Sequence, residues 1–120
     1  MSDAIENRFE ILGTDHTRFI VGNAKQAAAY YQDRYGFEPF AYEGLETGRR
    51  DVTRYALRQD KIVLVFETPM TPDHPDNEHQ ARHGDAVRDL ALWVDDARAA
   101  WEQTTGRGAV SLREPEIRED

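Results

Sequence analysis

The stretch Asp15–Phe37, which reads DHTRFIVGNAKQAAAYYQDRYGF, decides the fold of this chain. Alternating polar and apolar residues predict a short strand over His16–Val21. Asn23 follows at the position of a helix N-cap, and an Ala- and Tyr-rich segment then predicts a helix through Tyr35. Gly36 is the residue type that ends such a helix, because glycine adopts the left-handed conformation without strain. The stretch therefore predicts a strand, a capped helix and a defined stop.

A weaker copy of this pattern returns at Asp89–Gly108, DLALWVDDARAAWEQTTGRG. Val21 corresponds there to Val94, and Asn23 corresponds to Asp96. Three strand-like segments follow the first copy, whereas the second copy reaches the end of the sequence before such a set is complete. The sequence therefore predicts one and a half βαβββ units, and we expect the chain to end early.

These elements predict an α+β fold, in which a curved mixed sheet carries the helices on its convex face. The other expected elements are strands at Phe37–Tyr42, Val52–Arg58, Lys61–Glu67 and Leu90–Val94, a short helix within Asp76–Ala86, a second capped helix from Asp95 or Asp96 to about Thr105, and the start of a sixth strand at Glu114–Arg118. We expect residues 1–12 to form a loosely held arm. Residues 1–120 are expected to form one domain, with a first module at about 13–68, a linker at 69–85 and an incomplete second module at 86–120.

The composition excludes several functional classes. A net charge of −8 argues against nucleic-acid binding, because phosphate contacts need a basic surface. The absence of cysteine excludes disulfides and thiolate chemistry. The sequence contains no apolar run long enough to span a membrane, and MSDAIENRFE does not read as a secretory signal, so we expect a cytoplasmic protein.

The tandem pattern of strand, helix and three strands resembles the vicinal-oxygen-chelate superfamily, whose modules form curved sheets around a metal site. Within it, the chain resembles the N-terminal domain of the 4-hydroxyphenylpyruvate dioxygenases. The similar segments are VGNAKQAAAYY (Val21–Tyr31), GFEPFAYEGLETGRR (Gly36–Arg50), HGDAVRDLAL (His83–Leu92) and the C-terminal LREPEIRED. They follow the order and spacing of that domain and cover most of residues 14–120.

This resemblance implies a two-domain enzyme of tyrosine catabolism that converts 4-hydroxyphenylpyruvate and dioxygen into homogentisate and carbon dioxide. The related hydroxymandelate synthases use the same substrate and iron. In such enzymes two His and one Glu of the C-terminal domain hold iron(II). No position of this chain corresponds to those ligands. We therefore expect that the chain is non-catalytic, that none of its residues is a catalytic residue, and that it binds no cofactor itself. Its expected partner is the missing C-terminal catalytic domain.

The superfamily usually takes metal ligands from the first strand of a module and from the end of its fourth. His16 and Glu67 stand at those places, and Asp89 is the repeat partner of His16. His16, Glu67 and Asp89 are therefore candidate vestigial metal positions. Arg18 shares a face with His16, and a fixed cation disfavours a dication nearby. We expect Arg18 to pair with Glu67 or Asp89 in a buried polar network.

Three further histidines, His74, His79 and His83, raise the question of a zinc site. His79 and His83 are spaced i, i+4 on the expected helix, but the HExxH order of zinc proteases is missing. We therefore expect these side chains to have a structural or solvated role.

Two alternative functions remain open from the residues. The first is a self-standing ligand-binding module, similar to antibiotic-sequestering members of the superfamily, that acts as a homodimer. The second is a glyoxalase-like, metal-dependent isomerase or lyase, built in a dimer from His16 and Glu67 of both subunits. A dimer would cover the sheet edge that an incomplete module leaves open.

Overall fold

The computed structural model describes residues 9–117 of the 120-residue chain. Its elements are β1 (Ile11–Ile20), α2 (Ala24–Tyr35), β2 (Glu38–Glu43), the 3₁₀ helix η1 (Leu45–Thr47), β3 (Val52–Gln59), β4 (Ile62–Pro69), α3 (Asp76–His83), β5 (Ala86–Val94) and α4 (Ala97–Gly106). Two compact units are present, one formed by 14–91 and the other by the described parts of 1–13 and 92–120.

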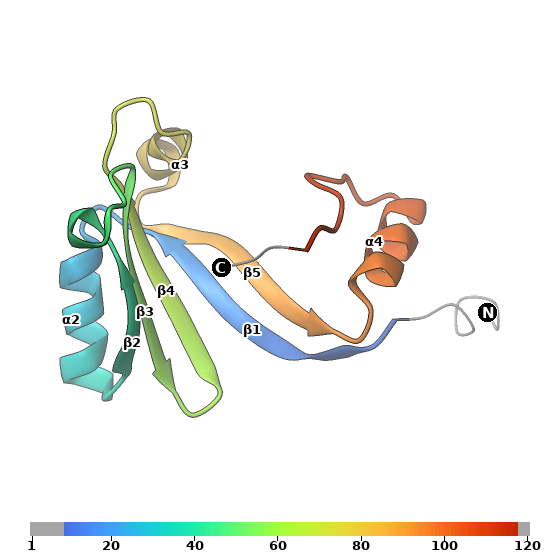
Figure 1. Ribbon diagram of the computed structural model, residues 1–120, viewed down its shortest axis with the longest axis horizontal. Helices are drawn as coiled ribbons and strands as arrows, with labels where there is room; N and C mark the ends of the chain where they lie inside the picture. The colour runs from blue at the N-terminus through green and yellow to red at the C-terminus, as the bar shows by residue number, and fades with distance from the viewer. Residues whose placement is uncertain (1–8, 118–120) are drawn as a thin grey trace. The chain divides into compact units, whose positions relative to one another are not determined.

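The strands form a mixed sheet in the order β2-β3-β4-β1-β5 (Figure 1). β3 pairs antiparallel with both β2 and β4, whereas β1 pairs parallel with β4. Phe66 of β4 thereby lies opposite Tyr55 of β3 on one side and Phe19 of β1 on the other. This arrangement confirms the predicted α+β class and mixed sheet.

Local signals set the limits of α2 as the sequence predicts. The side chain of Asn23 accepts a hydrogen bond from the backbone N–H of Gln26 at 3.0 Å. Gly36 closes the helix with a φ of 76°, and its N–H donates to the carbonyl of Gln32. Because a side chain at this φ is strained, glycine is the residue that the stop requires.

The hydrophobic core lies between α2 and the sheet. Its buried members are Val21, Ala24, Ala28, Phe37, Leu57 and Phe66. Phe66 stacks on Phe19 of β1 at 5.2 Å and on Tyr31 of α2 at 5.1 Å, measured between ring centroids. The small Ala side chains let α2 approach the strands closely, and the aromatic rings fill the remaining space.

Three sequence expectations need correction. β1 begins at Ile11, where a loose arm was expected, and β5 begins at Ala86, four residues before the expected Leu90. Pairing with a neighbouring strand extends a strand beyond what its own residue pattern indicates. Residues 114–117 form no strand, and the last residue of the expected sixth strand lies outside the described residues.

The smaller unit contains α4. Asp96 caps this helix by accepting a hydrogen bond from the N–H of Ala99 at 3.0 Å, as its correspondence to Asn23 predicts. The indole N–H of Trp101 donates to Ser111 at 2.8 Å, which holds the segment after the helix against it. Among the described residues, no helix is long and apolar enough to cross a membrane.

Replacing Gly36 with alanine should lower the free energy of unfolding by about 1 kcal/mol, because the new side chain is strained at a positive φ. Gly106→Ala is the matched control, since a Cβ there meets no atom within 4 Å and the backbone is not left-handed. Urea unfolding followed by circular dichroism measures both. Equal losses in the two variants would contradict this account of the helix stop.

Candidate functional site

One charged side chain from each strand forms a row across the sheet, on the face opposite α2. In strand order the charge row contains Glu43, Arg54, Glu67, Arg18 and Asp89, so that the sign alternates from strand to strand. Glu43 lies directly opposite Arg54, and Arg54 lies directly opposite Glu67. Opposite residues in antiparallel strands present their side chains on the same face, so the register itself aligns the row.

Ion pairs connect every neighbouring pair in the charge row. The Arg18 guanidinium donates from Nη1 to Oε2 of Glu67 at 2.7 Å and from Nε to Oδ2 of Asp89 at 2.8 Å. Arg54 donates from Nε to the same Glu67 oxygen at 3.0 Å and from Nη1 to Glu43 at 3.3 Å. Within the charge row, Glu67 is thus held by two guanidinium groups, and Arg18 is held by two carboxylates.

Glu67 is the most buried member of the charge row, with an exposed fraction of 1%. Its neighbour across the β1–β4 pair, Ile20, has an exposed fraction of 0%. A carboxylate in such surroundings is stable only when it is paired and hydrogen-bonded. Burial alone lowers the pKa of Arg18, but the hydrogen bonds and charges of Glu67 and Asp89 outweigh it and raise this pKa above its ordinary value. Arg18 is therefore a permanent cation.

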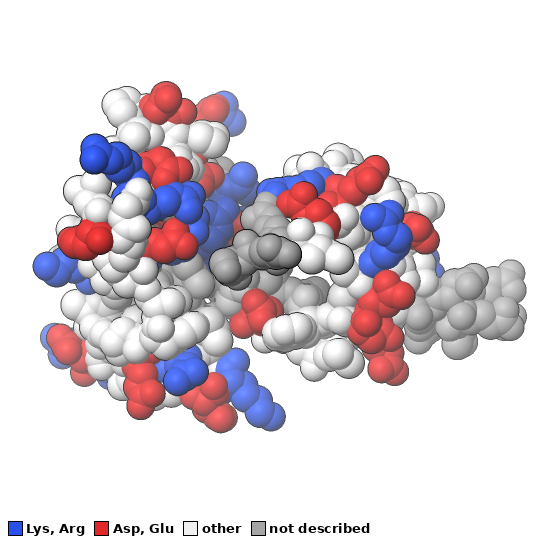
Figure 2. Space-filling model, viewed as in Figure 1, with Lys and Arg blue, Asp and Glu red and all other residues white. Residues whose placement is uncertain are grey.

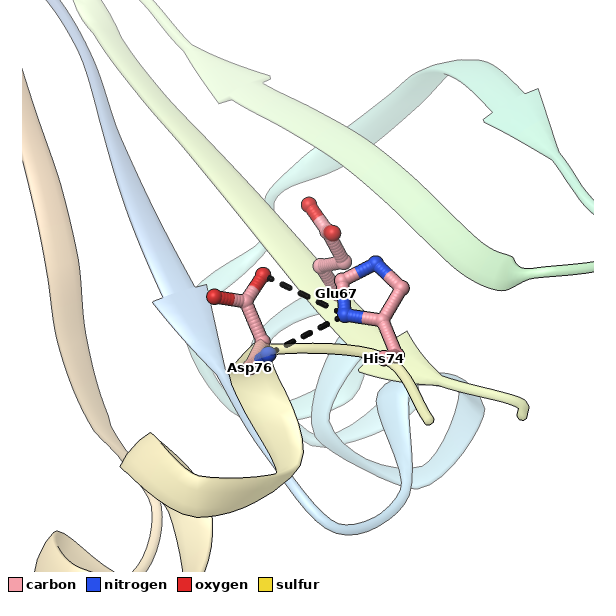
Figure 3. Close-up of side chains that lie close together, drawn as sticks. All are labelled: Glu67, His74 and Asp76. Atoms are coloured by element: carbon pink, nitrogen blue, oxygen red, sulfur yellow. Dashed lines mark hydrogen bonds and ion pairs between the residues drawn. The ribbon is translucent and has the colours of Figure 1, made fainter. Parts of the chain in front are cut away.

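Two further polar residues lie beside Glu67 (Figure 3), namely the half-buried His74 from the segment between β4 and α3 and the buried Asp76 at the start of α3. The Asp76 carboxylate forms ion pairs with Nη1 of Arg18 at 3.6 Å and with Nε of Arg88 at 3.3 Å. The backbone N–H of Asp76 donates to Nδ1 of His74 at 3.1 Å, and this accepting role is that of an unprotonated Nδ1. The charge row thus continues from the sheet into α3.

Donor atoms of Glu67, His74 and Asp76 all lie within 4.8 Å of one another, a spacing that suits a metal ion. The surrounding cations argue against one, because Glu67 already holds two guanidinium groups and Asp76 also holds two. A dication beside these fixed charges would be repelled. With Arg18 in place, this cluster does not fit a metal site.

The structure brings together two of the three candidate positions named from the sequence. Arg18 contacts both Glu67 and Asp89, as the expected polar network requires. His16 lies elsewhere, where its Nδ1 contacts Asp15 at 2.6 Å. Glu67 lies opposite Ile20 in the pairing of β1 with β4. Ile20 follows His16 by four residues, which corresponds to about 13 Å along the strand at the usual rise per residue.

Sequence reasoning missed Asp76. A structural or solvated role was expected for His74, whose side chain is 15% exposed and lies beside Asp76. The available signal was Asp76 itself, an acidic residue in the first turn of the expected helix. The three histidines do not converge. His79 and His83 instead place their rings 4.7 Å apart on α3, as their spacing of i, i+4 predicts.

Acidic and basic side chains are interspersed on the face shown in Figure 2. A further example is Arg49, which contacts Glu43 at 3.0 Å and so extends the pairing beyond the edge of the charge row. Such local pairing neutralises neighbouring charges. It is the arrangement expected of a structural network rather than of a surface that attracts a charged ligand.

Replacing Glu67 with glutamine should lower the free energy of unfolding by about 3 kcal/mol, because two guanidinium groups then lose their shared buried counter-charge. Glu78→Gln is the control, since its pair with Arg82 is about 70% exposed and should be worth less than about 1 kcal/mol. Chemical denaturation measures both values. A loss at Glu67 no larger than that at Glu78 would contradict the structural role of the charge row.

Comparisons with known proteins agree with this geometry. The family model of the Glyoxalase/Bleomycin resistance protein/Dioxygenase superfamily matches residues 15–119. The chain is 48% identical over 114 residues to the 4-hydroxyphenylpyruvate dioxygenase of Xenopus tropicalis and 47% identical over 114 residues to that of Danio rerio. Each match covers 94% of this chain and 29% of the relative, so the chain spans under a third of their length. The resemblance to these dioxygenases is thereby confirmed.

Solved structures show the same fold. A 4-hydroxymandelate synthase mutant from Streptomyces coelicolor matches with a TM-score of 0.82 and 30% identity, over 88% of this chain and 32% of that one. The methylmalonyl-CoA epimerase of the same organism matches with a TM-score of 0.73 and 22% identity, over 92% of this chain and 81% of that one, which concerns the fold alone. This chain belongs to the glyoxalase/bleomycin resistance protein/dioxygenase superfamily.

Proposed function

We propose that this chain is the N-terminal scaffold domain of a 4-hydroxyphenylpyruvate dioxygenase and performs no chemistry by itself. In this proposal the enzyme converts 4-hydroxyphenylpyruvate and dioxygen into homogentisate and carbon dioxide. Iron(II) belongs to a C-terminal domain, which is the partner of this chain. The hydroxymandelate synthases share the domain, and we favour the homogentisate-forming activity because the curated relatives carry that enzyme's name.

The observation that carries the proposal is the completely paired charge row. An active centre keeps an open ligand position or an unpaired acid, base or nucleophile. Here Glu67 and Asp89 are occupied by Arg18, and Asp76 is occupied by Arg18 and Arg88. In this proposal, the side chains on the sheet face that binds metal in other members of the superfamily pair with one another in this chain and stabilise the sheet.

The metal-dependent dimer is the alternative, and the close spacing of Glu67, His74 and Asp76 is the observation in its favour. That alternative also needs His16, which contacts Asp15 and lies some four residues along β1 from the level of Glu67. The permanent charge of Arg18 disfavours it further. We therefore place it second.

The isolated chain, supplied with iron(II), ascorbate and 4-hydroxyphenylpyruvate, should consume no oxygen. A chimaera in which this chain replaces the corresponding segment of the Xenopus tropicalis enzyme should consume oxygen and release homogentisate, because its scaffold is 48% identical to the native one. Oxygen electrode traces and chromatography of the product measure both. The unaltered Xenopus enzyme is the positive control.

Oxygen uptake by the isolated chain would overturn the proposal, since the chain would then hold its own iron. A chimaera that folds but stays inactive would also count against it, because a scaffold of this family should support the catalytic domain. Circular dichroism and gel filtration of the chimaera separate that result from simple misfolding.

His16→Ala should leave divalent-metal binding unchanged and lower the free energy of unfolding by no more than about 1 kcal/mol, because the His16 side chain hydrogen-bonds Asp15 alone among residues 9–117 and is 31% exposed. His83→Ala, at an exposed position of α3, is the matched control. Isothermal titration with Mn²⁺ and chemical denaturation provide the two readouts. Abolished metal binding in a folded His16 variant would instead favour the metal-dependent dimer.

A further inference from the structure

We propose that the positive charge of Arg18 takes the place of a metal ion in this module. Its guanidinium occupies the position where the side chains of Glu67, His74 and Asp76 would otherwise bind a divalent ion. Removing Arg18 alone should therefore create a metal site. This inference concerns the side chains of the chain itself and does not depend on the identity of the enzyme to which it belongs.

The contacts of Arg18 place its guanidinium among three carboxylates from three different elements. Glu67 comes from β4, Asp76 from α3 and Asp89 from β5. Their oxygens lie 2.7, 3.6 and 2.6 Å from the nitrogens of Arg18. Convergence of carboxylates from separate elements on one point is the arrangement by which proteins bind hard or borderline cations.

The charges around Arg18 favour a divalent ion only when Arg18 is removed. Arg18, Arg54 and Arg88 contact the carboxylates of Glu67, Asp76 and Asp89, and Arg54 also contacts Glu43, so that three positive charges face four negative ones. A divalent ion added beside Arg18 would leave an uncompensated positive charge in a partly buried place. Without Arg18 the same set carries two excess negative charges, which a divalent ion would balance.

The spacing of the donors supports the exchange of a guanidinium for a metal ion. Because donor atoms of Glu67, His74 and Asp76 lie within 4.8 Å of one another, some point lies no more than about 2.8 Å from all three. Metal–ligand distances in proteins are about 2.0–2.6 Å, so small side-chain movements would complete the site. Figure 3 shows the three side chains gathered beside the end of β4.

The decisive comparison is between Arg18→Met and Arg54→Met. Each variant removes one guanidinium from Glu67, but only the first also releases Asp76 and Asp89. Methionine retains the apolar stem of arginine, which limits the loss of packing. Isothermal titration and electron paramagnetic resonance with Mn²⁺ measure affinity and stoichiometry in the full chain.

Arg18→Met should bind one Mn²⁺ at least about tenfold more tightly than the unaltered chain, and Mn²⁺ should raise the melting temperature of this variant alone. Arg54→Met should bind Mn²⁺ as weakly as the unaltered chain. Arg18→Lys keeps the cation and should also remain a weak binder. Adding Asp76→Asn to Arg18→Met should abolish the gain.

Equal Mn²⁺ affinity of Arg18→Met and Arg54→Met would overturn the inference, because the gain would then reflect net charge alone. Tight binding by the unaltered chain would overturn it as well. If Arg18→Met fails to fold without metal, recovery of its circular dichroism spectrum on addition of Mn²⁺ supports the inference, and failure to recover in Arg18→Met and in Arg18→Gln overturns it. These readouts involve no oxygen consumption, so their outcome is separate from that of the scaffold proposal.

Discussion

The burial of Glu67 is the constraint on which the rest of this structure depends. A carboxylate that is 1% exposed in the middle of a sheet requires cations on both sides, and Arg18 and Arg54 provide them from the two adjacent strands. Those two guanidinium groups in turn require Asp89 and Glu43 on the strands beyond. One buried charge thus sets a pattern that extends across every strand of the described sheet.

The two faces of the sheet are stabilised by different forces. Tyr31 of α2 stacks on Phe66 and Phe66 on Phe19, between the helix and the sheet, where the removal of apolar surface from water drives association. The opposite face depends on geometry, because its ion pairs stabilise only while register and distance are correct. A shift of one residue between β3 and β4 would turn one of the two strands over, and would place either Arg54 in the core or Phe66 outside it. The charge row therefore specifies register, while the core supplies most of the stability.

This division is compatible with the proposed scaffold role, in which the same fold supports a protein without performing its chemistry. The strands of this chain place Glu67, Arg18 and Asp89 on one face, and the chemistry of such carboxylates depends on whether a cation is already present there. In this chain the cation is a side chain, which can neither be lost nor activate a substrate by coordination. The place held by Arg18 thereby becomes part of the folded framework.

The sequence by itself determined the elements whose signals are local. The cap at Asn23, the stop at Gly36 and the alternation around Phe19 depend on neighbours in the chain, so the α+β class and the strand–helix unit could be predicted. Tertiary structure alone decided that Asp76 joins Arg18 and that His16 does not. Those outcomes depend on strand register and on where the segment between β4 and α3 folds back, and such long-range geometry leaves no periodic signal in the sequence.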